Sequence, residues 1–340
     1  MDAIVSPKTL DALIARARAN GPVRVAVADA AQGVVLATIK RAAEDGLAIP
    51  HLVGPRDEIL PLAEAAGLDP GTVCLHDTGP DAAAAEMAVR LVHEGKADVV
   101  MKGNLHTDTF MHVLLDAQTG LRVPGQRVSH LFVLEVPGHD RLIGVTDAAI
   151  NIAPDLAAKA QICQNAVDAF HALGVAEPRV AVLSAVETVS QSITSTLDAA
   201  SLTLMARRGQ ISGAVVDGPL AFDNAVSPRA VAEKGILSDV AGRADILLVP
   251  DLVSGNVLAK ALEYLGNARA AGVALGLAAP VVLTSRADPE NARIASLALA
   301  ALLRPEVAPQ VKGEELHRSL RPAPVHESDC CPLPHRSKTP

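Results

Sequence analysis

The stretch PVVLTSRAD at Pro280–Asp288 shows most directly how this chain folds. An apolar, β-branched run stops at Ser285, Arg286 and Asp288, and an Ala/Leu-rich helical pattern follows over residues 291–303. A buried parallel strand has such a sequence, and open α/β sheets bind ligands at the carboxyl ends of such strands. The stretch therefore predicts a strand whose end delivers a hydroxyl, a guanidinium and a carboxylate to a site for a small anionic substrate.

Outward from this stretch, short apolar runs alternate with helical patterns along most of the chain. This alternation is typical of a parallel sheet whose faces are covered by helices, so it predicts an α/β fold. Helices are predicted over 30–45, 81–93, 155–173 and 192–208, and strands over 23–28, 49–53, 73–75, 98–101, 128–136, 141–146, 179–184, 213–216, 246–249, 273–275 and 281–284.

One segment departs from the alternation. Two β-rich runs flank Pro137-Gly138-His139-Asp140, which has the composition of a turn. We expect an antiparallel hairpin here, and we interpret it as the mark of a second subdomain that begins near residue 128.

Composition narrows the function. The chain has 340 residues, 49% of them hydrophobic and only 1% aromatic, so a core of Ala, Val, Leu and Ile is expected. The formal net charge is −8, and no basic patch interleaved with aromatic residues indicates nucleic-acid binding. Anionic ligands must then be bound by local Arg, Lys and helix N-termini against an unfavourable overall field.

The cysteines and the two ends of the chain indicate in which cellular compartment the protein is expected. The four cysteines form no CxxC motif, which favours a reducing cytoplasm, and no secretory signal or membrane-spanning run is expected. The end of the chain is rich in Pro, His and charged residues, and its His and Cys spacings match no metal-ligand pattern. We predict a disordered tail over 306–340 and no metal site.

The loop after the predicted strand 98–101 is a candidate anion site. Lys102 follows the strand, and Asn104 or Thr107 can cap the next helix beside His106. A helix N-terminus next to a lysine binds anions. The alternative is an ordinary loop with a capping threonine and a solvated lysine.

Three further strand ends carry polar loops. Two of them offer carboxylates and amides, and in the third a Gly-Asn pair is predicted to precede a helix, so that its N–H groups could point at a phosphate. Each loop taken alone is equally explained by turn formers and helix caps. The residues predicted here to bind substrate are Asp147, Asp217, Asp223, Asn224, Gly255 and Asn256.

Arg286, after the predicted strand 281–284, is a further candidate for binding an anion. Its guanidinium can bind an oxyanion in bidentate fashion, which a lysine cannot do. The alternative is that Arg286 forms an ion pair with Asp288 on the surface, which would contribute little to the stability of the fold. The chain lacks the GxGxxG, Walker, GxSxG and HExxH motifs of nucleotide-binding, hydrolase and zinc sites.

Seven motifs follow one another along the chain: MKGNLHTD (101–108), IGVTDAAINIAPD (143–155), LSAVE (183–187), VDGPLAFDNA (216–225), VPDL (249–252), GN (255–256) and LTSRAD (283–288). Together, in this order, they resemble the phosphate acetyltransferase/phosphate butyryltransferase family. The likeness runs from about residue 10 to 305 and is strongest to the transferase half of bifunctional enoyl-CoA hydratase/phosphate acetyltransferases, without the hydratase half.

The resemblance implies a fold similar to the isocitrate/isopropylmalate dehydrogenases, with mostly parallel sheets and an inter-domain cleft. Residues 1–128 plus 285–305 would form the first α/β domain and residues 129–284 the second. Ser285 and Arg286 would lie at the crossover, beside the cleft. A homodimer is usual in the family.

The resemblance also implies the reaction: reversible transfer of a short acyl group between CoA and phosphate. Acyl-CoA, phosphate and acyl phosphate are substrates, and no cofactor is bound permanently. A base takes the thiol proton, since a thiol with a pKa of about 8.5 is mostly protonated at neutral pH. The thiolate then attacks the acyl phosphate. Ser285 suits the developing oxyanion and Arg286 suits the phosphate.

Two positions depart from the family pattern. In the family pattern, the aspartate proposed as the base lies seven residues after the motif serine. In this chain that position is occupied by Ala292. Asp288 is the nearest substitute, with Asp147, Asp217 and Asp223 as further candidates. His112 stands where butyryl-specific relatives carry arginine, so that it either helps to bind phosphate or only packs on its helix.

Two other functions stay open at this stage. One is an NAD(P)-dependent, metal-assisted dehydrogenase on the same fold, although the sequence lacks an Asp-rich DxxxD array. The other is a non-catalytic CoA-binding paralogue, suggested by Ala292. The sequence does not order the apolar residues of the acyl pocket, so it leaves the chain-length preference open.

Overall fold

The structure is a computed structural model that describes residues 6–69, 71, 73–283 and 288–304. The described residues belong to one compact unit of the chain. The predicted tail over 306–340, and Ser285 and Arg286, lie outside the described residues.

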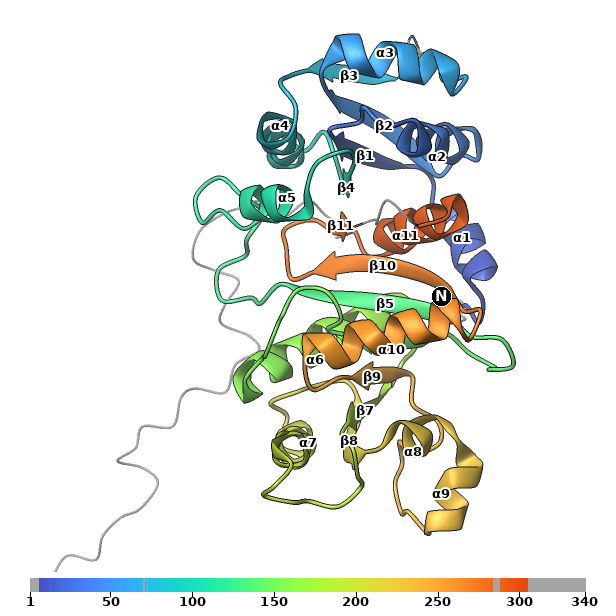
Figure 1. Ribbon diagram of the computed structural model, residues 1–340, viewed down its shortest axis with the longest axis vertical. Helices are drawn as coiled ribbons and strands as arrows, with labels where there is room; N and C mark the ends of the chain where they lie inside the picture. Colours follow the sequence, from blue (N-terminus) through green and yellow to red (C-terminus); the bar gives the residue numbers. More distant parts are fainter. Residues whose placement is uncertain (1–5, 70, 72, 284–287, 305–340) are drawn as a thin grey trace, which may run out of the picture. The chain divides into compact units, whose positions relative to one another are not determined.

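One sheet of eleven strands organises the described part of the chain (Figure 1). Its strand order is β3-β2-β1-β4-β11-β10-β5-β6-β9-β7-β8. The strands are β1 (Val23–Ala28), β2 (Ala48–Gly54), β3 (Cys74–Asp77), β4 (Val99–Lys102), β5 (Ser129–Glu135), β6 (Ile143–Thr146), β7 (Arg179–Leu183), β8 (Val215–Leu220), β9 (Ile246–Leu248), β10 (Arg269–Leu275) and β11 (Val281–Val282).

Most pairings in this sheet are parallel, as predicted. β3, β2, β1, β4 and β11 form one parallel set, and β6, β9, β7 and β8 form another. Three successive pairings between the sets are antiparallel: β11 with β10, β10 with β5, and β5 with β6. The carboxyl ends of the two parallel sets therefore lie at opposite margins of the sheet.

The predicted hairpin is confirmed by the β5–β6 pairing, in which Leu131 lies opposite Thr146. The prediction for β10 was too short. Its first residues, Arg269-Ala270-Ala271-Gly272, contain no β-branched side chain, and they are held extended by pairing with β5.

Helices cover both faces of the sheet. α1, α2, α6, α7 and α11 pack on one face, and α4, α5, α8 and α10 pack on the other. The helices are α1 (Leu10–Ala19), α2 (Gly33–Glu44), α3 (Arg56–Ala65), α4 (Ala82–His93), α5 (Thr107–Leu114), α6 (Leu156–Ala172), α7 (Thr194–Arg207), α8 (Phe222–Val226), α9 (Pro228–Lys234), α10 (Leu252–Tyr264) and α11 (Glu290–Leu302).

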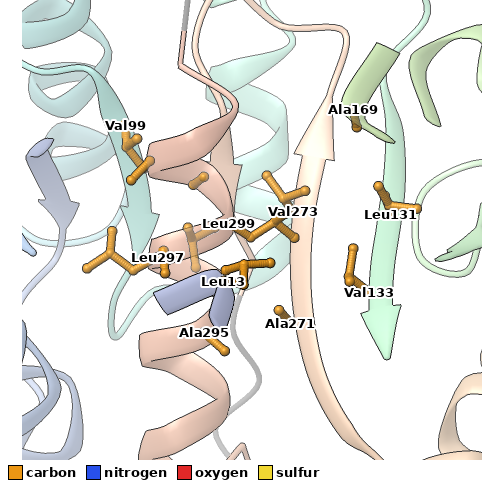
Figure 2. Close-up of a cluster of buried hydrophobic side chains, with 14 of the residues drawn as sticks. Leu13, Val99, Leu131, Val133, Ala169, Ala271, Val273, Ala295, Leu297 and Leu299 are labelled. Atoms are coloured by element: carbon orange, nitrogen blue, oxygen red, sulfur yellow. The ribbon is translucent and has the colours of Figure 1, made fainter. Parts of the chain in front are cut away.

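The core is aliphatic, as the scarcity of aromatic residues predicts. In Figure 2, Ala271 and Val273 of β10 face Ala295 and Leu299 of α11, and all four are buried. Successive side chains of a strand point to opposite faces, so Ala270 and Ala274 of β10 enter the cores of the other face. Small side chains on both partners let α11 lie close along β10.

Among the described helices, none combines the length and the apolar character needed to cross a membrane. The division into residues 1–128 plus 285–305 and residues 129–284 stays a prediction.

Candidate active site

Lys102, the last residue of β4, has a buried amino group at the margin where the first parallel set ends. Only 5% of the residue is exposed, and Nζ lies 3.5 Å from the carbonyl oxygen of Gly103. Val282 of β11 lies opposite Met101, so Leu283, the last described residue before Ser285 and Arg286, follows a strand that runs beside Lys102. The structure therefore brings β11 and the lysine to one margin.

Gly103 lets this loop cross very close to the loop after β1. A Cβ at position 103 would lie 2.0 Å from the carbonyl oxygen of Asp29 and 2.6 Å from that of Ala28. Two backbone hydrogen bonds fix the crossing: Gly103 N–H donates to Ala28 at 2.9 Å, and Asn104 N–H donates to Asp29 at 2.7 Å. Only glycine fits here, for lack of space rather than for a special backbone angle.

The predicted cap of α5 was wrong. His106 is the N-cap residue, and its side chain makes no capping hydrogen bond. Asn104, His106 and Thr107 are exposed at this helix start, and His112 is exposed one turn further along. The helix start thus presents backbone N–H groups without a side-chain cap near Lys102, which is the arrangement expected of an anion site.

Asp29 is a residue that sequence reasoning missed. It follows β1 with a φ of 54°, it is buried, and its Oδ1 has no hydrogen-bond partner. Burial raises the pKa of its carboxyl above the ordinary value. The sequence held one indication of this residue, because Asp29 directly follows a predicted strand. Aspartate is also one of the few residues that tolerate a positive φ.

Asp288 lies at the start of α11, directly before the N-cap residue Pro289. Burial, and in addition the negative charge of Asp288, raise the pKa of Glu263 in the last turn of α10 above its ordinary value. Glu263 is a second residue that the sequence did not reveal, because nothing in a helical pattern shows what faces its last turn.

Asp147 serves a turn at the opposite margin of the sheet. Its Oδ1 accepts the N–H groups of Ala149 and Ile150 at 2.9 and 3.0 Å, and its Oδ2 accepts the side-chain amide of Asn151 at 2.5 Å. Burial lowers the pKa of the neighbouring His130 to about 4, although the charge of Asp147 opposes the shift, so the ring is neutral at pH 7. The carboxylate of Asp147 is thus already occupied within its own loop.

Gly255 and Asn256 lie inside α10 and not before it, which corrects the sequence prediction. Asp251 caps the helix by accepting Ser254 N–H at 2.9 Å, so the helix begins at Leu252. A Cβ at position 255 would lie 2.8 Å from the carbonyl oxygen of Asp147, and Asn256 donates to the carbonyl of Ala148 at 3.3 Å. Both residues pack α10 against the Asp147 turn.

Asp217 lies within β8, whereas the predicted strand stopped before it. Its Oδ1 accepts Gly218 N–H at 2.9 Å, and its Oδ2 accepts the Ser238 hydroxyl. A hollow of about 630 Å³, also lined by Leu237 and Asp239, opens beside it on the last strand of the sheet.

Asp223 and Asn224 belong to a small charged network around α8. Asn224 is fully buried; it donates to Glu187 at 3.2 Å, and its Oδ1 has no partner. Lys234 lies 3.3 Å from Asp223 and 3.6 Å from Glu187. The N-cap residue of α8 is Ala221, so Asp223 is not the cap that the alternative reading expected. Glu187 and Lys234 are distant in sequence from one another, so no sequence pattern predicts that they meet around α8.

The predicted residues therefore divide between the two margins. Lys102, Asn104, His106, Thr107 and Asp288 follow or lie near the ends of β4 and β11, whereas Asp147, Asp223, Asn224, Gly255 and Asn256 follow β6, β8 and β9.

Comparisons with known proteins agree with the resemblance. Residues 78–301 match the family model described as phosphate acetyl/butaryl transferase. A phosphate acetyltransferase from Rhizobium meliloti is 52% identical over 296 residues, which cover 87% of this chain and 93% of the relative. A phosphate butyryltransferase from Clostridium acetobutylicum is 43% identical over 296 residues, which cover 87% and 98%.

Solved structures confirm the predicted fold class. A branched-chain phosphotransacylase from Enterococcus faecalis V583 superposes with a TM-score of 0.75 at 31% identity, covering 83% of this chain and 99% of that one. A 4-hydroxythreonine-4-phosphate dehydrogenase from Burkholderia phymatum shares the fold alone, with a TM-score of 0.50 and 16% identity over 83% of this chain and 98% of its own.

The matches favour an acyltransferase over the dehydrogenase and the non-catalytic paralogue. The relatives are named for both acetyl and butyryl transfer, so their names leave the chain-length preference open. With the family model matching more than half of its length, the chain belongs to the phosphate acetyltransferase/phosphate butyryltransferase family of acyltransferases.

Proposed function

We propose that this chain transfers a short acyl group reversibly between CoA and inorganic phosphate, with CoA as a substrate and no permanently bound cofactor. Beyond the family match, one observation carries most of the proposal. The buried side chain of Lys102 lies where β4 and β11 end side by side, and the chain continues from β11 towards Ser285 and Arg286. An overall charge of −8 makes such local cations necessary for binding phosphate.

In the proposed reaction the base, Asp288, takes the proton of the CoA thiol. The thiolate forms a C–S bond to the acyl carbon while the C–O bond to phosphate breaks, and phosphate leaves with the bonding electrons. Ser285 donates to the carbonyl oxygen as negative charge develops on it, and Arg286 holds the phosphoryl oxygens. The roles of Ser285 and Arg286 rest on the resemblance, since both lie outside the described residues.

Lys102 and the start of α5 complete the anion site in this proposal. The exposed side chains of Asn104, His106 and Thr107, together with the helix N–H groups, would hold phosphate oxygens, with His112 one turn away. Six other residues lie within β8 or follow β6, β8 and β9, and they make the local contacts described above. For these residues a role in substrate binding stays a prediction: Asp147, Asp217, Asp223, Asn224, Gly255 and Asn256.

A cytoplasmic homodimer is part of the proposal. Val253, Val257 and Tyr264 of α10 are 69%, 62% and 68% exposed, and helical geometry places them within about 40° of one another. Such an apolar stripe on the outer face of a helix supports burial against a second copy. Cys74 and Cys163 are free thiols, in keeping with a reducing compartment.

The test is release of the CoA thiol from acetyl-, propionyl- and butyryl-CoA, with and without phosphate. We expect phosphate-dependent release that needs no nicotinamide cofactor and yields acyl phosphate. CoA binding without any thiol release from the three substrates would contradict the proposal and favour a retired paralogue.

A further inference from the structure

We propose that Phe132 of β5 contacts the acyl chain of the substrate and limits its length, with the ring of His130 holding the phenyl ring in place. Phe132 is thereby the residue that sets the acyl-chain preference. The inference rests on the proposed function, which assigns Ser285, two residues after Leu283, to the carbonyl of the acyl group.

The strand register places Phe132 close to the end of β11. Val281 of β11 lies opposite Ala274 of β10 in an antiparallel pairing. The same register, continued by two residues, sets Leu283 beside Gly272 of β10. Gly272 in turn lies opposite Phe132 of β5. Neighbouring strands are about 4.8 Å apart, so Leu283 and Phe132 are separated by one strand, which carries a glycine at this point.

The rings of Phe132 and His130 cover this glycine. A Cβ at position 272 would lie 3.2 Å from Cε1 of Phe132 and 3.1 Å from both Cε1 and Nε2 of His130. The two rings meet edge to face, with their centres 4.4 Å apart, which is a favourable arrangement for aromatic rings. The phenyl ring therefore leans across β10 in the direction of β11.

Phe132 lies where two hydrophobic clusters on this face of the sheet end. The cluster formed with α4 and α5 extends to Ala274 and Leu283. The cluster formed with α8 and α10 extends to Ala270 and Phe132. Gly272, between the two alanines of β10, adds no side chain to either cluster. Because Phe132 is only partly buried, its ring can contact a ligand at this boundary.

His130 keeps this surface uncharged. The residue is 1% exposed, and burial lowers the pKa of its ring to about 4, so the imidazole is neutral at pH 7 although the charge of Asp147 opposes the shift. Its Nδ1 has no hydrogen-bond partner among the described residues. Packing against Phe132 and Gly272 therefore orients the imidazole, and an apolar acyl chain meets a phenyl ring beside a neutral one.

The other phenylalanines and the single tyrosine are not placed for this role. Phe110 is fully buried within the cluster of α4 and α5. Phe170 packs on the opposite face of the sheet, where a Cβ at Gly144 would lie 2.8 Å from its Cε2. Phe222 follows β8, the last strand of the sheet, and Tyr264 is 68% exposed at the end of α10.

The experiment compares kcat/KM for thiol release from acetyl-, propionyl- and butyryl-CoA in Phe132→Leu, Gly272→Ala and a control. Leucine is shorter than phenylalanine, and one methylene changes discrimination roughly 10–200-fold, so Phe132→Leu should raise the butyryl-to-acetyl ratio of kcat/KM about 10-fold. Alanine at position 272 pushes both rings away from β10 into the space left for the acyl chain, so the ratio should fall.

The control is Phe170→Leu, which makes the same truncation at a ring that also lies over a glycine, on the other face of the sheet. Its ratio should stay within about twofold of the wild type, because selectivity depends on contacts with the substrate. A rise in Phe170→Leu equal to that in Phe132→Leu would overturn the inference, since general loosening of the core would then explain both.

Urea unfolding establishes that each variant is folded. An unchanged ratio in folded, active Phe132→Leu overturns the inference and leaves the proposed function intact. If Phe132→Leu does not fold, Gly272→Ala decides, and an unchanged ratio there overturns the inference. Failure of the wild type to release thiol from all three substrates would instead overturn the proposed function.

Discussion

Replacing Gly103 by alanine should damage both stability and catalysis, because the loop after β4 crosses the loop after β1 with no space for a side chain. The new Cβ would lie 2.0 Å from the carbonyl oxygen of Asp29, and an ordinary contact begins at 3.4 Å, so the loops must separate by about 1.4 Å. The atoms in the way are backbone, so no side-chain rotation relieves the clash.

That separation breaks two backbone hydrogen bonds: Gly103 N–H to Ala28 at 2.9 Å, and Asn104 N–H to Asp29 at 2.7 Å. A buried hydrogen bond left unmade costs about 1–3 kcal/mol, so the expected loss is about 2–6 kcal/mol. This is a large part of the roughly 5–15 kcal/mol by which natural domains are stable. Lys102 adjoins the displaced residue, and a shift of this size should lower phosphate-dependent thiol release roughly 10²-fold.

The assay is urea unfolding together with the thiol-release rate. Gly33→Ala is the control, because Gly33 begins α2 and has no atom within 4 Å of the added Cβ; it should unfold within about 0.5 kcal/mol of the wild type. If Gly103→Ala matches Gly33→Ala in both measurements, the close crossing does not position the site, and the reasoning is refuted.

Three further predictions follow from charge and exposure. Arg286→Ala should raise the KM for phosphate and lower kcat, and unchanged kinetics would remove Arg286 from the site. Nδ1 of His51 lies 3.0 Å from Nε2 of His76, and burial lowers the pKa of both rings. The folded state therefore disfavours protonation of these rings. The stability that the neutral rings contribute is present above about pH 6.5 and is lost as the pH falls below it. His51→Gln should therefore flatten the decline of the urea midpoint between about pH 7.5 and about pH 5.5, and an equally steep decline would contradict this account. Val257→Asp should shift the mass in solution from dimer to monomer by light scattering; an unchanged mass would place the interface elsewhere.

The sequence predicted the local elements better than their directions. Val23–Ala28 was predicted with the bounds that the structure has, since its apolar run is bounded by polar residues and a turn. An apolar run carries no direction, however, so the three antiparallel pairings around β10 and β5 could not be read from periodicity. The start of α10 was available in principle, because Asp251 three residues before Ser254 is a capping pattern.

The candidate site was predictable only where one loop supplies it. Lys102 and its neighbours are consecutive, and the loop composition identified them. Glu263 and Asp29 depend on what packs against them from distant segments, and a sequence pattern does not contain that information. For Asp147 the opposite holds. The sequence around it is typical of a binding site, but in the structure its carboxylate accepts the hydrogen bonds of a turn.

The place of β11 between β4 and β10 has a consequence for biosynthesis. The strand that completes the first parallel set is encoded near the end of the chain, about 180 residues after β4. At ribosomal rates of about 5–20 residues per second, the free edge of β4 waits roughly 10–40 s for its neighbour. During that interval β4 is paired with β1 on one side only, and its other, apolar edge is open to pairing with a wrong strand.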